Sequence, residues 1–157
     1  MFRVALDDVR SHYNVGAIFR TADAVGVEEL YLGGITPRPI DRFGRVVTEM
    51  QKTALGSTES VSWIGTDTLA SELEKLKAEG VTIVAVEQSQ ESVSLKTATI
   101  PTNVCYVFGN EVTGISPAVL SLADLVVDLP MRGKKESLNV SVTAGVVLYH
   151  HLWYVSS

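Results

Sequence analysis

The chain has 157 residues, of which 46% are apolar and 20% are charged, and its formal net charge is −5 at pH 7. This length predicts one domain covering residues 1–157, and no apolar run approaches the ~20 residues that a membrane span requires. The negative charge argues against a protein that coats nucleic acid non-specifically, because lysine and arginine supply most of such binding.

The first third of the chain predicts two strands with an amphipathic helix between them. Residues 2–9, "FRVALDDV", read as a strand, and residues 14–26, "NVGAIFRTADAVG", place apolar residues at helical spacing. Asn14 is the expected N-cap of this helix and Gly26 its end. A second strand, residues 28–34, leads into the loop "ITPRPIDRFGR", and long loops of this kind tend to be functional.

Strands and helices continue to alternate after an ill-defined helix near residues 46–55. The expected strands are residues 61–65, 81–87, 103–108 and 124–130, and the expected helices are residues 66–80, a short one after Ser116-Pro117, and 137–155. A polar connection is expected between residues 88 and 102. The last helix is apolar nearly all round and must be covered by this domain or by a second subunit. This alternation predicts an α/β fold with a mostly parallel sheet flanked by helices.

Glycine-bearing loops follow three of the predicted strands. They are Gly33-Gly34, the segment from Gly109 to Gly114, and Gly133. Ligands of α/β sheets collect at the carboxyl ends of strands. However, "FGNEVTGIS" lacks the lysine of a P-loop, and no loop contains GxGxxG, so neither ATP nor NAD is favoured. Each loop alone is more readily explained as a turn than as a ligand cradle.

The sequence predicts no metal centre and no hydrolase triad. His150 and His151 are adjacent and cannot face one ion from the same side of a helix, so we expect both near the surface at a helix end. A GxSxG elbow is absent.

Cys105 has no second cysteine for an internal disulfide and lies in an apolar run, which predicts a buried residue in a reducing compartment. The acidic first segment is unlike a signal peptide, and we expect a cytoplasmic protein with no membrane contact.

Five polar residues stand at places that could carry chemistry. Arg20 lies opposite the apolar stripe of the first predicted helix, Asn14 opens that helix, and Glu111 lies inside a glycine loop directly after an apolar strand. Ser137 and Asn139 open the final helix. A solvated side chain, a helix cap or a turn contact is the simpler explanation for each one taken separately.

Taken together, three segments resemble the signature motifs of the SpoU (TrmH) family of RNA 2′-O-ribose methyltransferases, within the SPOUT superfamily. They are residues 14–26, residues 108–116, and residues 129–150, "LPMRGKKESLNVSVTAGVVLYH", in the family's order. The resemblance implies S-adenosyl-L-methionine as the cofactor and a C-terminal deep trefoil knot, which would be an exception to the rule that chains do not thread loops. It also implies a homodimer, with the first and last helices as the expected interface.

The resemblance further implies site residues. The cofactor would be bound, largely through backbone groups, by Val86, Gly109, Leu129 and Leu138, with Met131 nearby. The prime catalytic residue would be Arg20, supported by Asn14, Glu111, Ser137 and Asn139. Because a guanidinium does not normally deprotonate in proteins, we expect Arg20 to hold the target phosphate and to stabilise developing oxyanion charge rather than to act as a base. Glu111 is expected to orient Arg20 or Asn14.

The expected substrate is a structured tRNA or rRNA. We see no counterpart of the extra RNA-recognition domain that many relatives carry, so substrate choice would fall to basic side chains near the site. The candidates for phosphate contact are Arg38, Arg42, Arg45, Arg132, Lys134 and Lys135. Two alternatives stay open: a non-catalytic RNA-binding or assembly protein with the same fold, and an enzyme that methylates a base atom of RNA.

Overall fold

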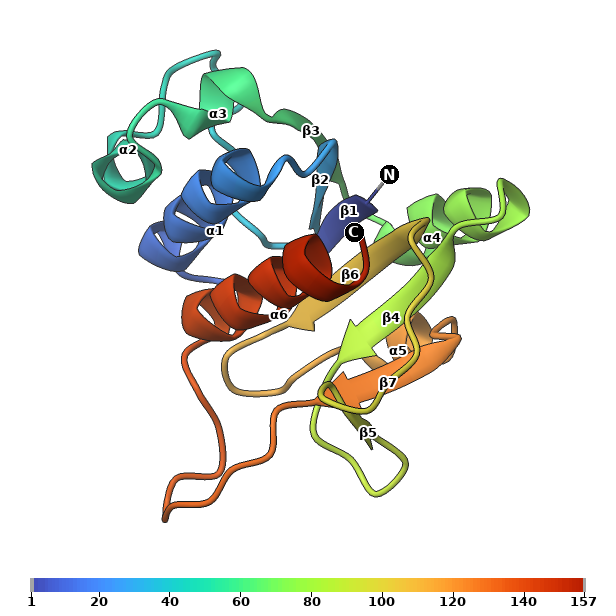
Figure 1. Cartoon of the computed structure of the whole chain (residues 1–157). Helices are drawn as coiled ribbons and strands as arrows, with labels where there is room; N and C mark the ends of the chain where they lie inside the picture. The colour runs from blue at the N-terminus through green and yellow to red at the C-terminus, as the bar shows by residue number, and fades with distance from the viewer. Residues whose placement is uncertain (1, 157) are drawn as a thin grey trace.

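The computed structural model describes residues 2–156, and within them a parallel β-sheet of seven strands is flanked by helices (Figure 1). The strands lie in the order β3-β2-β1-β6-β4-β7-β5, and every neighbouring pair is parallel. Their bounds are β1 (Phe2–Asp7), β2 (Glu29–Gly33), β3 (Ser62–Thr66), β4 (Thr82–Val86), β5 (Val93–Ser94), β6 (Val104–Gly109) and β7 (Leu125–Asp128). The predicted α/β fold with a mostly parallel sheet is confirmed.

Helices cover both faces of the sheet, so its central strands are hidden from solvent. The helices are α1 (His12–Val25), α2 (Thr48–Ala54), α3 (Ser57–Ser60), α4 (Leu69–Ala78), α5 (Pro117–Leu120) and α6 (Val140–Tyr154). One face is covered by α1 and α6, with α2 and α3 packed beside α1, and the other face is covered by α4 and α5 (Figure 1). Parallel strands buried on both faces read as continuous apolar runs, as these do.

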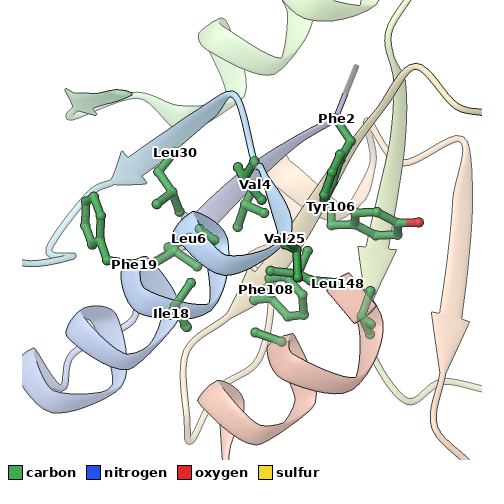
Figure 2. Close-up of a cluster of buried hydrophobic side chains, with 14 of the residues drawn as sticks. Phe2, Val4, Leu6, Ile18, Phe19, Val25, Leu30, Tyr106, Phe108 and Leu148 are labelled. Atoms are coloured by element: carbon green, nitrogen blue, oxygen red, sulfur yellow. The ribbon is translucent and has the colours of Figure 1, made fainter. Parts of the chain in front are cut away.

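The central pair of strands, β1 and β6, divides its side chains between two apolar clusters. The register places Val4 beside Tyr106 and Leu6 beside Phe108, and all four point toward α1 and α6 (Figure 2). Each fully buried apolar side chain of this size contributes roughly 1.5–3 kcal/mol. Cys105 belongs to the opposite cluster, as predicted for a buried residue, and burial raises the pKa of its thiol to about 12.

Helix α1 begins three residues earlier than predicted, because its N-cap is Ser11 rather than Asn14. The Asn14 backbone N–H donates to Ser11 Oγ at 3.2 Å, which leaves the Asn14 side chain available for other contacts. The helix ends at Gly26, whose φ of +75° is a conformation that glycine adopts without strain. Gly16 lies where α1 crosses α2, and a Cβ there would overlap the Thr53 side chain and the Met50 carbonyl.

Two further features differ from the sequence predictions. The connection predicted between residues 88 and 102 contains the two-residue strand β5, which pairs with β7. The expectation of a surface position was wrong for His151, which is fully buried, stacks on Phe2 with ring centroids 4.2 Å apart, and has its Nδ1 2.9 Å from the Tyr106 hydroxyl. A helix that is apolar on every side has no stripe to indicate which residues face the sheet.

Helix α6 is only partly covered within the described chain. Its buried residues are Ala144, Val147, Leu148 and His151, while its exposed apolar residues are Val142, Val146, Leu152, Trp153 and Tyr154. Among residues 2–156, none of the helices combines the length and apolar content needed to cross a lipid bilayer.

Candidate active site

A cavity of about 460 Å³ opens at the carboxyl ends of β4, β6 and β7. Three connections line it: the one that follows β4, the one that follows β6, and residues 129–139 between β7 and α6. The carboxyl edge of a parallel sheet is the usual place for a ligand in this class of fold. All five residues that we assigned to the cofactor line this cavity: Val86, Gly109, Leu129, Met131 and Leu138.

The loop after β6 is closed by its own hydrogen bonds. Asn110 and Gly114 exchange backbone N–H···O bonds of 3.1 and 3.0 Å, and Asn110 Oδ1 accepts the N–H groups of Val112 and Thr113 at 2.8 and 3.0 Å. A P-loop instead points its N–H groups at phosphates. Because these amides are already used inside the loop, the glycine spacing here does not make a triphosphate cradle.

Glycine at position 109 permits the tight closure of this loop. A Cβ on Gly109 would overlap the backbone of Gly114 and Ile115, so any larger residue would push the two sides of the loop apart. Gly114 itself has a φ of +71°, in the left-handed region. Gly109 and Gly114 thus add no side chain to the cavity wall, whereas Asn110, Glu111 and Val112 of the same loop also line it.

A hydrogen-bonded network joins the three sequence motifs at the edge of the cavity. Glu111 Oε1 accepts from the Asn14 side-chain amide at 3.3 Å, and Asn14 Oδ1 accepts from the Asn139 amide at 3.1 Å. Asn139 Oδ1 also caps α6 by accepting the Ser141 N–H at 2.9 Å. These contacts lock the start of α1, the loop after β6 and the start of α6 together.

Glu111 is held as a carboxylate by the start of α1. It accepts backbone N–H groups from Arg10 at 3.0 Å and Ser11 at 3.1 Å in addition to the Asn14 amide. Partial burial alone would raise the pKa of Glu111, but these hydrogen bonds outweigh it and leave the pKa below its ordinary value. A carboxylate with a lowered pKa is a weak base, so the position suits Glu111 to orienting neighbours rather than to removing a proton.

The other two residues assigned to catalysis lie apart from this network. Ser137 lines the cavity. Arg20 is exposed on α1, beyond the residues that line the cavity, and the side chain that Glu111 contacts is Asn14, not Arg20. Within the described chain the cavity thus has no contribution from Arg20.

Two acidic residues of the cavity were missed by the sequence analysis. Glu87 lies directly after β4, where its Oε2 accepts the Ile115 N–H at 2.8 Å, and Asp128 ends β7, where its Oδ2 accepts the Ser92 hydroxyl at 2.6 Å. With Glu111 they give the cavity three carboxylates, which favour a cationic ligand. The only available signal was that Glu87 ends its predicted strand. In the described part of the chain, no group of three or more His, Cys, Asp or Glu side chains is placed to hold a metal ion.

The six basic candidates for RNA contact form two groups on the surface. Arg38, Arg42 and Arg45 lie between β2 and α2, where Arg38 and Arg42 line a second cavity of about 640 Å³. The remaining three are exposed in the segment between β7 and α6: Arg132, Lys134 and Lys135. Acidic partners pair with Arg38 and Arg45, namely Asp67 at 3.0 Å and Asp41 at 2.9 Å.

Comparison with known proteins identifies relatives across almost the whole chain. The model of the SpoU rRNA Methylase family matches residues 1–149. The chain is 37% identical over 143 residues to the 23S rRNA (guanosine-2'-O-)-methyltransferase RlmB of Neisseria meningitidis. The aligned region covers 91% of this chain and 54% of that protein.

Solved structures with the same fold include two enzymes of this kind. The A. aeolicus TrmH/SpoU tRNA modifying enzyme matches with a TM-score of 0.83 and 33% identity, covering 96% of this chain and 73% of that one. The AdoMet-bound rRNA methyltransferase from Sinorhizobium meliloti matches with a TM-score of 0.82 and 30% identity, covering 95% and 54%. The chain spans little more than half the length of curated relatives such as the Neisseria protein.

Proposed function

The chain belongs to the SpoU rRNA methylase family, and from this premise we propose that it transfers a methyl group from S-adenosyl-L-methionine to a ribose 2′-hydroxyl of tRNA or rRNA. The observation that carries the proposal is the Asn14–Glu111–Asn139 network, which joins all three motifs at the mouth of the carboxyl-edge cavity. Separately, each residue had a simpler explanation as a cap or turn contact; together they form one site.

The cavity fits the proposed cofactor in size and charge. Its volume of about 460 Å³ lies within the range of small-molecule sites. The carboxylates of Glu87, Glu111 and Asp128 suit the sulfonium and ammonium groups of S-adenosylmethionine, while the internally bonded amides after β6 offer nothing to a triphosphate. Val86, Gly109 and Leu138 would hold the cofactor, which supplies an electrophilic methyl carbon.

The protein's part in the reaction is to position the ribose and to stabilise charge. Bound S-adenosylmethionine would supply the methyl group to the ribose 2′-oxygen and leave as neutral S-adenosylhomocysteine, and the hydroxyl proton would pass to solvent water. Glu111 and Asn139 fix the Asn14 amide at the cavity mouth, where it can hold the ribose. Arg20 would bind the phosphate beside the target nucleotide and stabilise the developing oxyanion, since a guanidinium does not normally act as a base in proteins.

Arg20 also gives a reason for a homodimer. Because it lies on the exposed face of α1 outside the cavity lining, it would complete the active site of a second copy rather than its own. The exposed apolar side chains of α6, including Val142, Val146 and Leu152, together with Tyr13 of α1, offer an interface for that copy. Sedimentation at micromolar concentration should give a dimer, and a monomer would contradict this part of the proposal.

We also propose that residues 1–157 act as one cytoplasmic domain whose C-terminal segments form the deep trefoil knot of the family. The sheet order supports the knot, since β6 lies between β1 and β4 while the chain later returns from β7 to place α6 beside α1.

Calorimetric titration with S-adenosylmethionine and S-adenosylhomocysteine, followed by methyl transfer to total RNA depleted of ribose methylation, tests the function. Recovery of 2′-O-methylated nucleosides after RNA digestion is the expected result. Recovery of a base-methylated nucleoside would instead indicate the base-modifying alternative. Absence of cofactor binding would contradict an enzyme and favour the non-catalytic RNA-binding protein.

A further inference from the structure

The connection between β2 and α2 contains a short, internally bonded hairpin, residues 39–47, which we call the arginine hairpin. The Val47 N–H donates to the Pro39 carbonyl at 3.0 Å, and the Asp41 N–H donates to the Arg45 carbonyl at 2.9 Å. The Gly44 N–H donates to the Asp41 carbonyl at 3.0 Å. The hairpin thus has a defined backbone although it carries almost no apolar core.

Phe43 stands at the tip of the arginine hairpin and is held there by Asp41. Asp41 Oδ1 accepts the N–H groups of Phe43 at 2.8 Å and Arg45 at 2.9 Å, while Asp41 Oδ2 pairs with the Arg45 side chain. Phe43 is 66% exposed, so its ring contributes little to the fold. A phenylalanine that is fixed in position but left in solvent is suited to contact a partner.

The guanidinium groups of Arg42 and Arg45 lie over the Phe43 ring, which is still 66% exposed. The Cζ atoms of Arg42 and Arg45 lie 4.8 and 5.0 Å from the centroid of Phe43, within cation–π range. The side chain of Arg38 lies against Gly65 at the neighbouring cavity, close enough that a Cβ on Gly65 would overlap it. The hairpin therefore presents an aromatic face and positive charge together, on a chain whose net charge is −5.

The arginine hairpin lies along the same sheet edge as the proposed active site. The cavity beside it is lined by Gly34 after β2, by Gly65 at the end of β3 and by His12, which begins α1. His12 follows Ser11, whose N–H donates to Glu111 of the active-site cavity. The start of α1 thus bridges the two cavities.

An aromatic ring beside guanidinium groups suits an unpaired base with its flanking phosphate. The ring can stack on the base, and the guanidinium groups can contact the phosphate. Bases in a duplex are already stacked on one another, whereas unpaired bases stack on aromatic side chains and arginine planes. We propose that Phe43, beside Arg42 and Arg45, is the platform on which an unpaired RNA base close to the target nucleotide stacks. This inference rests on the proposed function and adds that the substrate is recognised through a single-stranded loop.

Binding of two defined RNAs to matched Phe43 variants tests the platform. The first is a short RNA hairpin whose single-stranded loop carries 2-aminopurine, and the second is a blunt RNA duplex of equal charge. Phe43→Leu keeps an apolar side chain but removes the aromatic face, whereas Phe43→Tyr keeps both. We expect Phe43→Leu to weaken binding of the RNA with the single-stranded loop by about 5- to 100-fold. The same variant should no longer quench the fluorescence of 2-aminopurine in that loop. Phe43→Tyr should retain both signals, and affinity for the duplex should not change.

The outcomes separate this inference from the proposed function. Equal binding and quenching by wild type and Phe43→Leu would overturn the platform, while methyl transfer by the wild-type protein would leave the proposed function standing. Loss of the dimer in sedimentation of Phe43→Leu would show that the ring packs against protein, which also overturns the platform. Failure of the wild-type protein both to bind the hairpin RNA and to transfer methyl groups to RNA would remove the two proposals together.

Discussion

Acidification should destabilise this protein through His151. The imidazole is fully buried, its Nδ1 lies 2.9 Å from the Tyr106 hydroxyl, and its Nε2 has no hydrogen-bond partner among the described residues. Burial lowers the pKa of His151 from 6.5 to about 4, and the adjacent His150 acts in the same direction. Between pH 6.5 and pH 4 the unfolded chain therefore binds this proton more readily than the folded chain does. The stabilisation is complete above pH 6.5 and is lost as the pH falls toward 4.

The size of the effect follows from the two pKa values. A shift from 6.5 to about 4 makes unfolding easier by about 2 kcal/mol at pH 5 relative to pH 7, and by at most about 3 kcal/mol at lower pH. Glu111 and Asp124 also have lowered pKa values, but carboxylates lose their contribution at lower pH. Burial also lowers the pKa of His150, so the comparison of pH 7 with pH 5 reports on both histidines, and a variant of His151 is needed to separate its part.

Urea denaturation at fixed protein concentration, at pH 7 and at pH 5, measures this prediction. His151→Phe removes the titrating group while keeping a ring against Phe2, and should lose most of the pH dependence even though it leaves the Tyr106 hydroxyl without its partner. His12→Gln removes an exposed histidine and serves as the control. If His151→Phe and the wild-type protein lose equal stability on acidification, the reasoning from burial is refuted.

Substitutions at three positions test the site and its support. Gly109→Ala should weaken S-adenosylhomocysteine binding by roughly tenfold or more in calorimetry, because the added methyl group overlaps the backbone of Gly114; unchanged affinity would contradict a backbone-lined site. Arg20→Lys should retain measurable methyl transfer whereas Arg20→Ala should lose it, and equal loss in both variants would argue against simple charge stabilisation. Gly16→Ala should lower the unfolding free energy by about 1–3 kcal/mol in urea titration, since its methyl group overlaps Thr53; wild-type stability would show that α2 moves aside freely.

The alternation of strands and helices could be predicted because each central strand is a continuous apolar run between turn residues. Strand β5 could not, since a two-residue strand exists through its pairing with β7 rather than through its own composition. The start of α1 was misplaced because Ser11 and Asn14 are both good caps, and the choice depends on Glu111 and Asn139, which lie far away in sequence.

The residues of the candidate site could be predicted only because the three sequence motifs were recognised together as those of one family. The residues assigned to the cofactor lie around one cavity, but Glu87 and Asp128 escaped notice because their position depends on which strands end side by side. Arg20 lies outside the cavity lining of its own chain, and only the resemblance to the family implied that it would serve a site formed with a second copy.

The network at the cavity mouth also determines when the site can exist during synthesis. Its two central hydrogen bonds join residues separated by 97 and 125 positions in sequence. Contacts of such long range form late, because the entropy of closing a long loop must be overcome first. Asn139 is the N-cap of α6, close to the C-terminal end of the sequence. While this segment is still inside the ribosome, the network at the cavity mouth is incomplete. A partly made molecule thus lacks the Asn14–Asn139 hydrogen bond, and the network is complete only when α6 docks beside α1.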